Sequence, residues 1–316
     1  MFSRRRTPSD LSGQTAIITG GYTRLGYVCA NALLSRSLSH LIITVRDEKK
    51  GQEVVVALQQ LYPAANYEVW LLDVHSNDSI LAFAQRCEEL RQIDCVALNA
   101  GLATGNFTFK GNTKLEETFD VDYFSTVLVT FLLLPVLGAK RSSSRPARLT
   151  LVCTEACQPP DLKRQTSQPA HLDSLYEEDS EHYPTTKLHL SMFIQKLKEK
   201  VNRRDVTVDI AGFDHARNSE EDSQALDCLE RRTSVVQYLF ARSAAWVCLG
   251  PAAAKFDATD PTRFTLNHDL HPWWLSRIMQ TPEARSISDG LWEVTLDKLD
   301  WADARGLLAL LAGNSA

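Results

Sequence analysis

Short apolar runs rich in β-branched residues alternate with helix-length segments along most of the chain. The apolar runs are residues 16–18, 41–45, 69–72, 95–98, 149–152 and 206–210. Runs of this kind, without polar alternation, are typical of parallel strands buried on both faces. The segments between them that have helical patterns are residues 24–35, 48–61, 79–92, 114–137 and 183–201. This order predicts a doubly wound parallel α/β sheet with right-handed crossovers.

The amino-acid composition excludes several classes of protein. The 34 Lys and Arg residues against 39 Asp and Glu give a net charge of -5, so we expect no nucleic acid partner. With 44% hydrophobic and 23% charged residues, disordered and collagen-like chains are excluded. The seven cysteines form no C-x-x-C pair, which argues against a disulfide framework or a zinc site. We therefore assign no metal and expect a reducing, cytoplasmic location.

The chain is predicted to form one domain, residues 13–316, behind a flexible tail of residues 1–12. The arginines of this tail precede no apolar segment, so it does not resemble a secretory signal. The longest apolar run, residues 127–137, has eleven residues, and a membrane span needs about 20, so we expect no membrane span. Residues 157–181 interrupt the repeat and predict an ordered excursion. Residues 213–316 are expected to form a substrate lid, and several tryptophans in this region are expected near the strand ends where ligands bind: Trp246, Trp273, Trp274, Trp292 and Trp301.

The first strand runs directly into a glycine-lined turn, Thr19-Gly20-Gly21-Tyr22-Thr23-Arg24-Leu25-Gly26. Such a turn at the start of a helix lets backbone N–H groups and the helix dipole meet a pyrophosphate. An ordinary strand-to-helix turn is an equally good interpretation of this segment alone. On the first interpretation, the candidate dinucleotide ligands are Thr19, Gly20, Gly21, Arg24, Leu25 and Gly26.

Polar residues follow the next three strands. Arg46 comes after the second strand, where a basic side chain would pair with the 2′-phosphate of NADP; a plain solvated charge is the alternative. Asp73 and Val74 follow the third strand, and Asn99-Ala100-Gly101 follows the fourth. Because parallel strands end at one edge of the sheet, these residues are predicted to lie together.

Tyr183 and Lys187 lie four residues apart at the start of a predicted helix. This spacing places both side chains on one helix face, where the ammonium can lower the pKa of the phenol. The pair then forms a general acid, although an ordinary pair on a helix surface would have the same spacing.

Together these motifs, with Tyr183-x-x-x-Lys187 last, resemble the short-chain dehydrogenase/reductase family. The similarity covers residues 14 to about 300 and is greatest to the retinol-dehydrogenase-like branch, which includes fungal secondary-metabolism reductases. It implies a Rossmann fold in which Tyr183 protonates the substrate carbonyl and Lys187 binds the nicotinamide ribose. It also implies that Asp73 faces the adenine, and that Asn99 and Gly101 line the nucleotide groove.

Several family positions carry other residues here. Arg24 replaces the middle glycine of the phosphate loop, and Thr154 replaces the serine that holds the substrate carbonyl. Asp122 replaces the helix asparagine, and its charge would offset that of Lys187. After the sixth strand, Ala211-Gly212 replaces Pro-Gly, which leaves Gly212 as a candidate cofactor ligand. The threonine that the family usually carries a few residues later has no counterpart here. Only 14 glycines occur, as expected if nucleotide contacts have loosened.

The leading hypothesis is an NADPH-dependent reductase of an apolar ketone or aldehyde from secondary metabolism. Its catalytic residues would be Tyr183, Lys187, Thr154 and Asp122. The alternative is an enzyme on the same fold that has lost hydride transfer and catalyses a cofactor-independent cyclisation, isomerisation or dehydration. A non-catalytic interaction module is a third hypothesis, and the resemblance also allows a homo-oligomer.

Overall fold

The computed structural model describes residues 10–102, 116–154, 182–213, 255–257, 260–265 and 278–313. Its main sheet has six parallel strands in the order β3-β2-β1-β4-β5-β6. The strands are β1 (Thr15–Thr19), β2 (His40–Val45), β3 (Asn66–Leu71), β4 (Cys95–Leu98), β5 (Ala147–Thr154) and β6 (Val206–Phe213). The predicted doubly wound Rossmann sheet is confirmed, with its switch point between β1 and β4.

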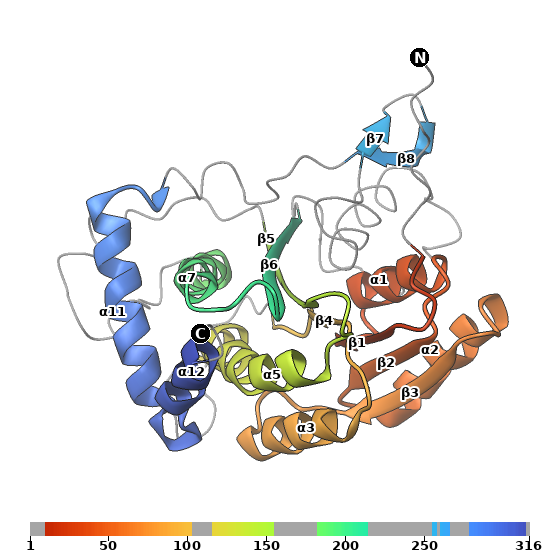
Figure 1. Cartoon of the computed structure of the whole chain (residues 1–316), viewed down its shortest axis with the longest axis horizontal. Coiled ribbons are helices and arrows are strands. Elements are labelled where there is room, and N and C mark those ends of the chain that lie inside the picture. The colour runs from red at the N-terminus through yellow and green to blue at the C-terminus, as the bar shows by residue number, and fades with distance from the viewer. Residues whose placement is uncertain are drawn as a thin grey trace.

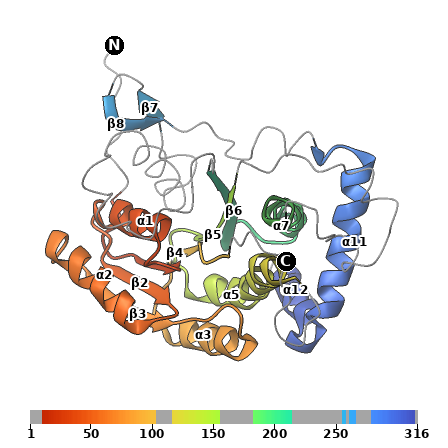
Figure 2. The same ribbon diagram turned by 180° about the vertical axis from the view of Figure 1, so that it is seen from behind.

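Helices cover both faces of this sheet, as Figures 1 and 2 show from opposite sides. They include α1 (Arg24–Leu34), α2 (Glu48–Leu61), α3 (Asn77–Glu89), α5 (Thr126–Lys140) and α7 (His182–Lys198). Strand residues alternate between the two cores: Ile17 packs in the core on the α3 and α5 side, and Ile18 in the core on the α1 side. The apolar runs are buried because both faces of each strand meet helices.

The helix before β5 is not uniform. It begins with α4 (Glu117–Phe119), passes through the π-helical turn η1 (Asp120–Ser125) and continues as α5. The sequence predicted one regular helix over residues 114–137, of which 114 and 115 lie outside the described residues. The stretch Glu117–Lys140 is long and apolar enough to cross a membrane, but 78% of its most apolar part is buried inside the fold. It is therefore a core helix.

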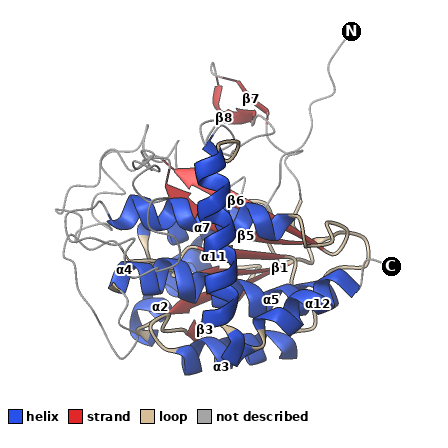
Figure 3. Ribbon diagram, turned by 90° about the vertical axis from the view of Figure 1, so that its left-hand side faces the viewer, coloured by secondary structure: helices blue, strands red, loops and turns tan. Residues whose placement is uncertain are grey.

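Two C-terminal helices form an outer layer. In the views of Figures 1 and 3, α11 (Pro282–Lys298) lies against α7, and α12 (Ala304–Gly313) lies against α5. The short helix η5 (Asp300–Ala302) connects α11 to α12. Trp292 of α11 is 6% exposed and stacks on Phe193 with ring centroids 5.0 Å apart. Trp292 is thus a core residue, whereas the sequence predicted it near a ligand. A separate antiparallel pair is formed by β7 (Lys255–Asp257) and β8 (Asp260–Thr265).

Candidate active site

The turn between β1 and α1 needs its glycines for its own geometry. Gly20 has φ +64°, in the left-handed region that other residues rarely adopt. A Cβ on Gly26 would lie 2.5 Å from the Gly20 carbonyl oxygen. The Asn99 side-chain amide donates to the carbonyls of Thr19 and Gly20 at 3.0 and 3.2 Å. These contacts fix the turn at the switch point of the sheet.

The first turn of α1 presents its N–H groups without a side-chain cap. The N-cap residue, Thr23, donates its hydroxyl to the Gly20 carbonyl at 2.8 Å instead of accepting from the helix. The turn contains no acidic residue. The helix start therefore suits a phosphate, which would accept from these N–H groups and meet the positive end of the dipole. The side chain of Arg24 lies outside the described residues.

Arg46 is exposed directly after β2. The neighbouring acid, Asp47, accepts from the Lys49 N–H at 2.9 Å and so caps α2. Within the part of the chain that the structure describes, no ion pair involving Arg46 is formed. Its guanidinium is available for an anion at this edge of the sheet.

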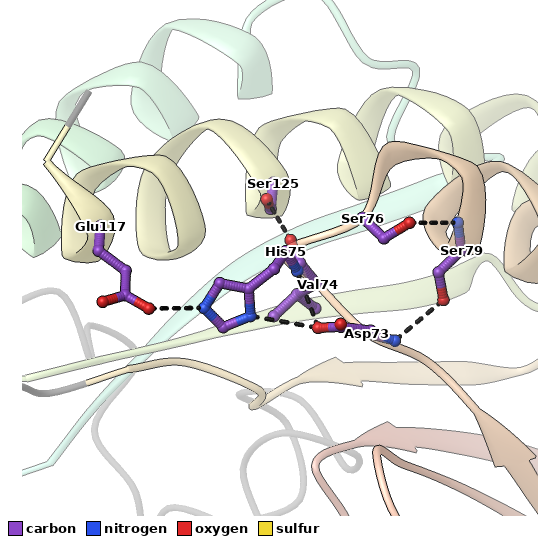
Figure 4. Close-up of polar contacts among 7 residues, drawn as sticks. All are labelled: Asp73, Val74, His75, Ser76, Ser79, Glu117 and Ser125. Atoms are coloured by element: carbon purple, nitrogen blue, oxygen red, sulfur yellow. Dashed lines mark hydrogen bonds and ion pairs between the residues drawn. The ribbon is translucent and has the colours of Figure 1, made fainter. Parts of the chain in front are cut away.

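Asp73 begins a tightly bonded connection between β3 and α3, drawn in Figure 4. Its Oδ1 accepts from the His75 N–H at 3.1 Å and lies 3.1 Å from His75 Nδ1. The other ring nitrogen, Nε2, lies 3.1 Å from Glu117 Oε1, and the Ser125 hydroxyl donates to the Val74 carbonyl at 2.5 Å. Sequence reasoning missed these partners. The contacts with Glu117 and Ser125 join residues far apart in the chain, whereas the contact between Asp73 and His75 is local.

Tyr183 and Lys187 are brought together on α7, with Lys187 Nζ 5.4 Å from the centroid of the Tyr183 ring. The same Nζ lies 3.3 Å from Asp122 Oδ2. The Lys187 side chain is 6% exposed and that of Asp122 is fully buried. The structure thus unites three of the predicted catalytic residues and makes the acid a direct partner of the lysine.

The residues after β4 complete this arrangement. The Leu102 N–H donates to Asp122 Oδ1 at 2.7 Å. A Cβ on Gly101 would lie 2.8 Å from that oxygen and 3.4 Å from Lys187 Nζ. A glycine is therefore needed here so that the turn after β4 can approach the ion pair.

Burial and charge act in opposite directions on this pair. Burial lowers the pKa of Lys187, but the charges of Asp122, Tyr183 and Cys153 outweigh it, so the pKa is raised and the ammonium persists at neutral pH. Burial raises the pKa of Asp122, against the effects of Lys187 and the Leu102 amide. The site therefore holds a permanent cation close to the phenol.

The remaining predicted positions lie at strand ends or outside the described residues. Thr154 ends β5 and pairs with Phe213, while Gly212 pairs with Cys153. The side chain of Thr154, the excursion of residues 157–181 and the tryptophans at 246, 273 and 274 lie outside the described residues. Among the side chains that are described, no group of His, Cys, Asp and Glu is arranged to hold a metal ion.

Known proteins are similar to this chain in sequence and in fold. The family model for short chain dehydrogenases matches residues 14–149. The chain is 31% identical to the short chain dehydrogenase/reductase mfmJ of Annulohypoxylon moriforme over 97% of this chain and 90% of that protein. It is 32% identical to the short chain dehydrogenase virL of Hypocrea virens over 94% of this chain and 88% of that protein. The solved complex of RhlG with NADP from Pseudomonas aeruginosa has a TM-score of 0.56 at 18% identity and covers 83% of this chain and 98% of its own.

The parallel sheet and its strand-end motifs define a protein of the Rossmann type, and its relatives are short-chain dehydrogenases. The chain belongs to the short-chain dehydrogenase/reductase family. Its similarity to fungal secondary-metabolism reductases, expected from the motifs, is confirmed.

Proposed function

We propose that the protein is an NADPH-dependent reductase of a ketone or aldehyde carbonyl, with Tyr183 as the proton donor. The observation that carries this proposal is the buried Lys187 ammonium, 5.4 Å from the Tyr183 ring. A cation in that position stabilises the phenolate left when the hydroxyl gives up its proton. Membership of an oxidoreductase family supports hydride transfer as the chemistry.

The residues at the carboxyl edge of the sheet fit a dinucleotide. The uncapped N–H groups of α1 would hold the pyrophosphate, and Asp73 would meet the adenine. The exposed Arg46 favours the 2′-phosphate of NADPH over the free ribose hydroxyl of NADH. The NADP named in the RhlG complex supports this choice. When bound, the nicotinamide would supply the hydride.

The chain's own groups would then handle the proton and the geometry. The Tyr183 hydroxyl donates its proton to the carbonyl oxygen as negative charge develops there. Lys187 binds the ribose and supports the phenolate, and Asp122 positions Lys187 through their contact. The Thr154 hydroxyl is proposed to hold the carbonyl oxygen. An apolar secondary metabolite is the expected substrate, in a cytoplasmic enzyme.

The first test is calorimetric titration of cofactor-free protein with NADPH and with NADH. Micromolar binding of NADPH and weaker binding of NADH are expected. A panel of apolar ketones and aldehydes is then followed by the loss of nicotinamide absorbance. Binding of neither dinucleotide would overturn the proposal and leave the cofactor-independent cyclisation, isomerisation or dehydration to be tested.

The proton donor is tested with Tyr183→Phe. Reduction should fall about 10²- to 10⁴-fold, the usual contribution of a positioned general acid, while the NADPH dissociation constant stays unchanged. Tyr67→Phe is the matched control, because it removes a hydroxyl bonded to the Tyr62 carbonyl on the β3 side of the sheet. Unchanged turnover in Tyr183→Phe would show that another group delivers the proton.

A further inference from the structure

His75 lies between two carboxylates from separate parts of the chain (Figure 4). Its Nδ1 is 3.1 Å from Asp73 Oδ1, and its Nε2 is 3.1 Å from Glu117 Oε1. The Asp73 side chain is 51% exposed, that of His75 is 24% exposed, and that of Glu117 is only 5% exposed. One ring therefore joins an exposed acid on the β3–α3 connection to a buried acid at the start of α4.

The number of ring protons determines how many of these contacts are hydrogen bonds. An ionised carboxylate only accepts, and a neutral imidazole has one N–H. Both contacts of His75 are hydrogen bonds only when the ring is doubly protonated. Asp120 of η1 is another acid close to His75, and the buried Glu116 precedes Glu117 in the chain. Burial raises the pKa of Asp120, and the charges of His75 and of Lys298 on α11 lower it.

Loss of one ring proton affects the two acids unequally. Loss of a hydrogen-bond donor destabilises a buried carboxylate more than an exposed one, because water can donate to the exposed carboxylate instead. The remaining proton should therefore stay on Nε2, facing Glu117. The lone pair of Nδ1 then faces Asp73 Oδ1 at 3.1 Å, which repels the carboxylate.

The backbone around Asp73 is held independently of this ring. The Asp73 N–H donates to the Ser79 hydroxyl at 2.9 Å, and the Val74 carbonyl accepts from Ser125. The His75 N–H also donates to Asp73 Oδ1 at 3.1 Å, so the ring acts on the orientation of the carboxylate beside this backbone bond and does not set the path of the chain. Within the described residues, no hydrogen bond to the second oxygen of Asp73, Oδ2, is formed, and it can accept from the amino group of an adenine.

We propose that His75, when doubly protonated, is a positioning residue that orients Asp73 toward the adenine of the dinucleotide. The proposal rests on the proposed function, which assigns the adenine to Asp73. Binding of the cofactor should then weaken as His75 loses a proton. The β3–α3 connection becomes a pH-dependent part of the cofactor site, separate from the proton chemistry at Tyr183.

The test compares dissociation constants of NADP⁺ at about pH 5.5 and about pH 8. His75→Gln keeps one donor but has no titrating ring. Because the phosphate of the cofactor titrates identically in both proteins, the ratio of the two dissociation constants isolates His75. We expect wild type to bind more tightly than the variant at the lower pH, by roughly three- to tenfold, and to lose that advantage at the higher pH.

His40→Gln is the matched control. His40 Nε2 contacts Glu68 Oε1 at 3.0 Å on the β2 and β3 strands, so the variant removes a comparable histidine–carboxylate pair. Its affinity ratio to wild type should not change with pH. A second measurement needs no variant: in cofactor-free wild type, ¹⁵N NMR should show the His75 ring protonated on both nitrogens at the lower pH and on Nε2 alone at the higher pH.

The outcomes separate the two proposals. Binding of neither NADP⁺ nor NADPH at any pH overturns both. Binding with the same wild-type to His75→Gln ratio at both pH values overturns the role of His75 and leaves the reductase standing. A His75 ring that is singly protonated throughout, or whose remaining proton lies on Nδ1, likewise overturns it.

Discussion

At the scale of single residues, the ion pair between Lys187 and Asp122 determines how strongly the cation acts on its surroundings. The two side chains are 3.3 Å apart and almost completely buried, so water screens their attraction little. A neutral amide, which the family carries at this position, would leave the ammonium uncompensated. The site of this chain therefore has the usual lysine but a weaker field at Tyr183.

The variant Asp122→Asn tests this effect. The uncompensated ammonium would stabilise the Tyr183 phenolate more strongly, so the acid form needed for reduction would be lost at lower pH. We expect the alkaline limb of the kcat profile to move down by roughly one pH unit, the lower end of the effect of a single close charge. Asp209→Asn, which removes an acid paired with Arg148 on the edge strand β6, is the control. An unmoved profile would show that the charge of Asp122 does not act on Tyr183.

A second prediction concerns Arg46 and the choice of cofactor. Arg46→Asp should weaken NADPH binding by roughly 10- to 100-fold, the value of one or two hydrogen bonds to a charged group, and should improve NADH binding. The same charge change at Lys50, an exposed residue of the neighbouring α2, is the control. Calorimetry gives both affinities. Equal losses in the two variants would indicate a general effect of net charge instead of a contact with the 2′-phosphate.

At the scale of elements, the helix before β5 shows where sequence patterns stop being informative. Its existence was predictable from its apolar length, but its π-helical turn was not. The turn packs against distant partners: the Tyr123 hydroxyl lies 2.8 Å from that of Thr295 on α11, and the Tyr123 ring meets Phe193 of α7 edge-on with centroids 6.0 Å apart. An extra residue in one turn changes the apolar period very little, so only the packed structure reveals which side chains face Lys187.

Two glycines in helices have different surroundings, so their substitution distinguishes the effect of close packing from that of helix propensity. Gly26 in α1 would place a Cβ 2.5 Å from a backbone oxygen, whereas a Cβ on the exposed Gly290 of α11 would meet nothing within 4 Å. Gly26→Ala should therefore reduce the free energy of unfolding by roughly 1–3 kcal/mol. Gly290→Ala should increase it by about 0.5–1 kcal/mol, because alanine favours the helix. Urea unfolding of cofactor-free protein measures both free energies. If Gly290→Ala also lowered the free energy of unfolding, the space around Gly290 would be filled.

At the scale of the whole molecule, the sheet could be predicted because each strand carries its own signal. An apolar run such as residues 41–45 predicts a strand from its own residues alone. Family motifs then place Arg46 and Asp73 at strand ends. The contact of His75 with Glu117, and that of Lys187 with Asp122, depend on how separate elements pack. Trp292 was misplaced for the same reason, since its contact with Phe193 exists only once α11 lies on α7.

Because α7 is buried between the sheet and the outer helices, the free energy of unfolding depends on pH. His189 on this helix is fully buried, and burial lowers its pKa to about 4. Between about pH 6.5 and pH 4 the unfolded chain therefore binds a proton that the folded chain does not, so stability falls as pH falls. The loss between about pH 7 and pH 5 should be roughly 2 kcal/mol.

The variant His189→Gln removes this titration. Its free energy of unfolding in urea will be lower at neutral pH, because a buried ring is lost, but it should fall by roughly 2 kcal/mol less than that of wild type between about pH 7 and pH 5. Asp122, whose raised pKa acts with the opposite sign, is present in both proteins and cancels from the comparison. Parallel losses in wild type and His189→Gln would mean that His189 takes up its proton in the folded state, and that α7 admits water to its buried face.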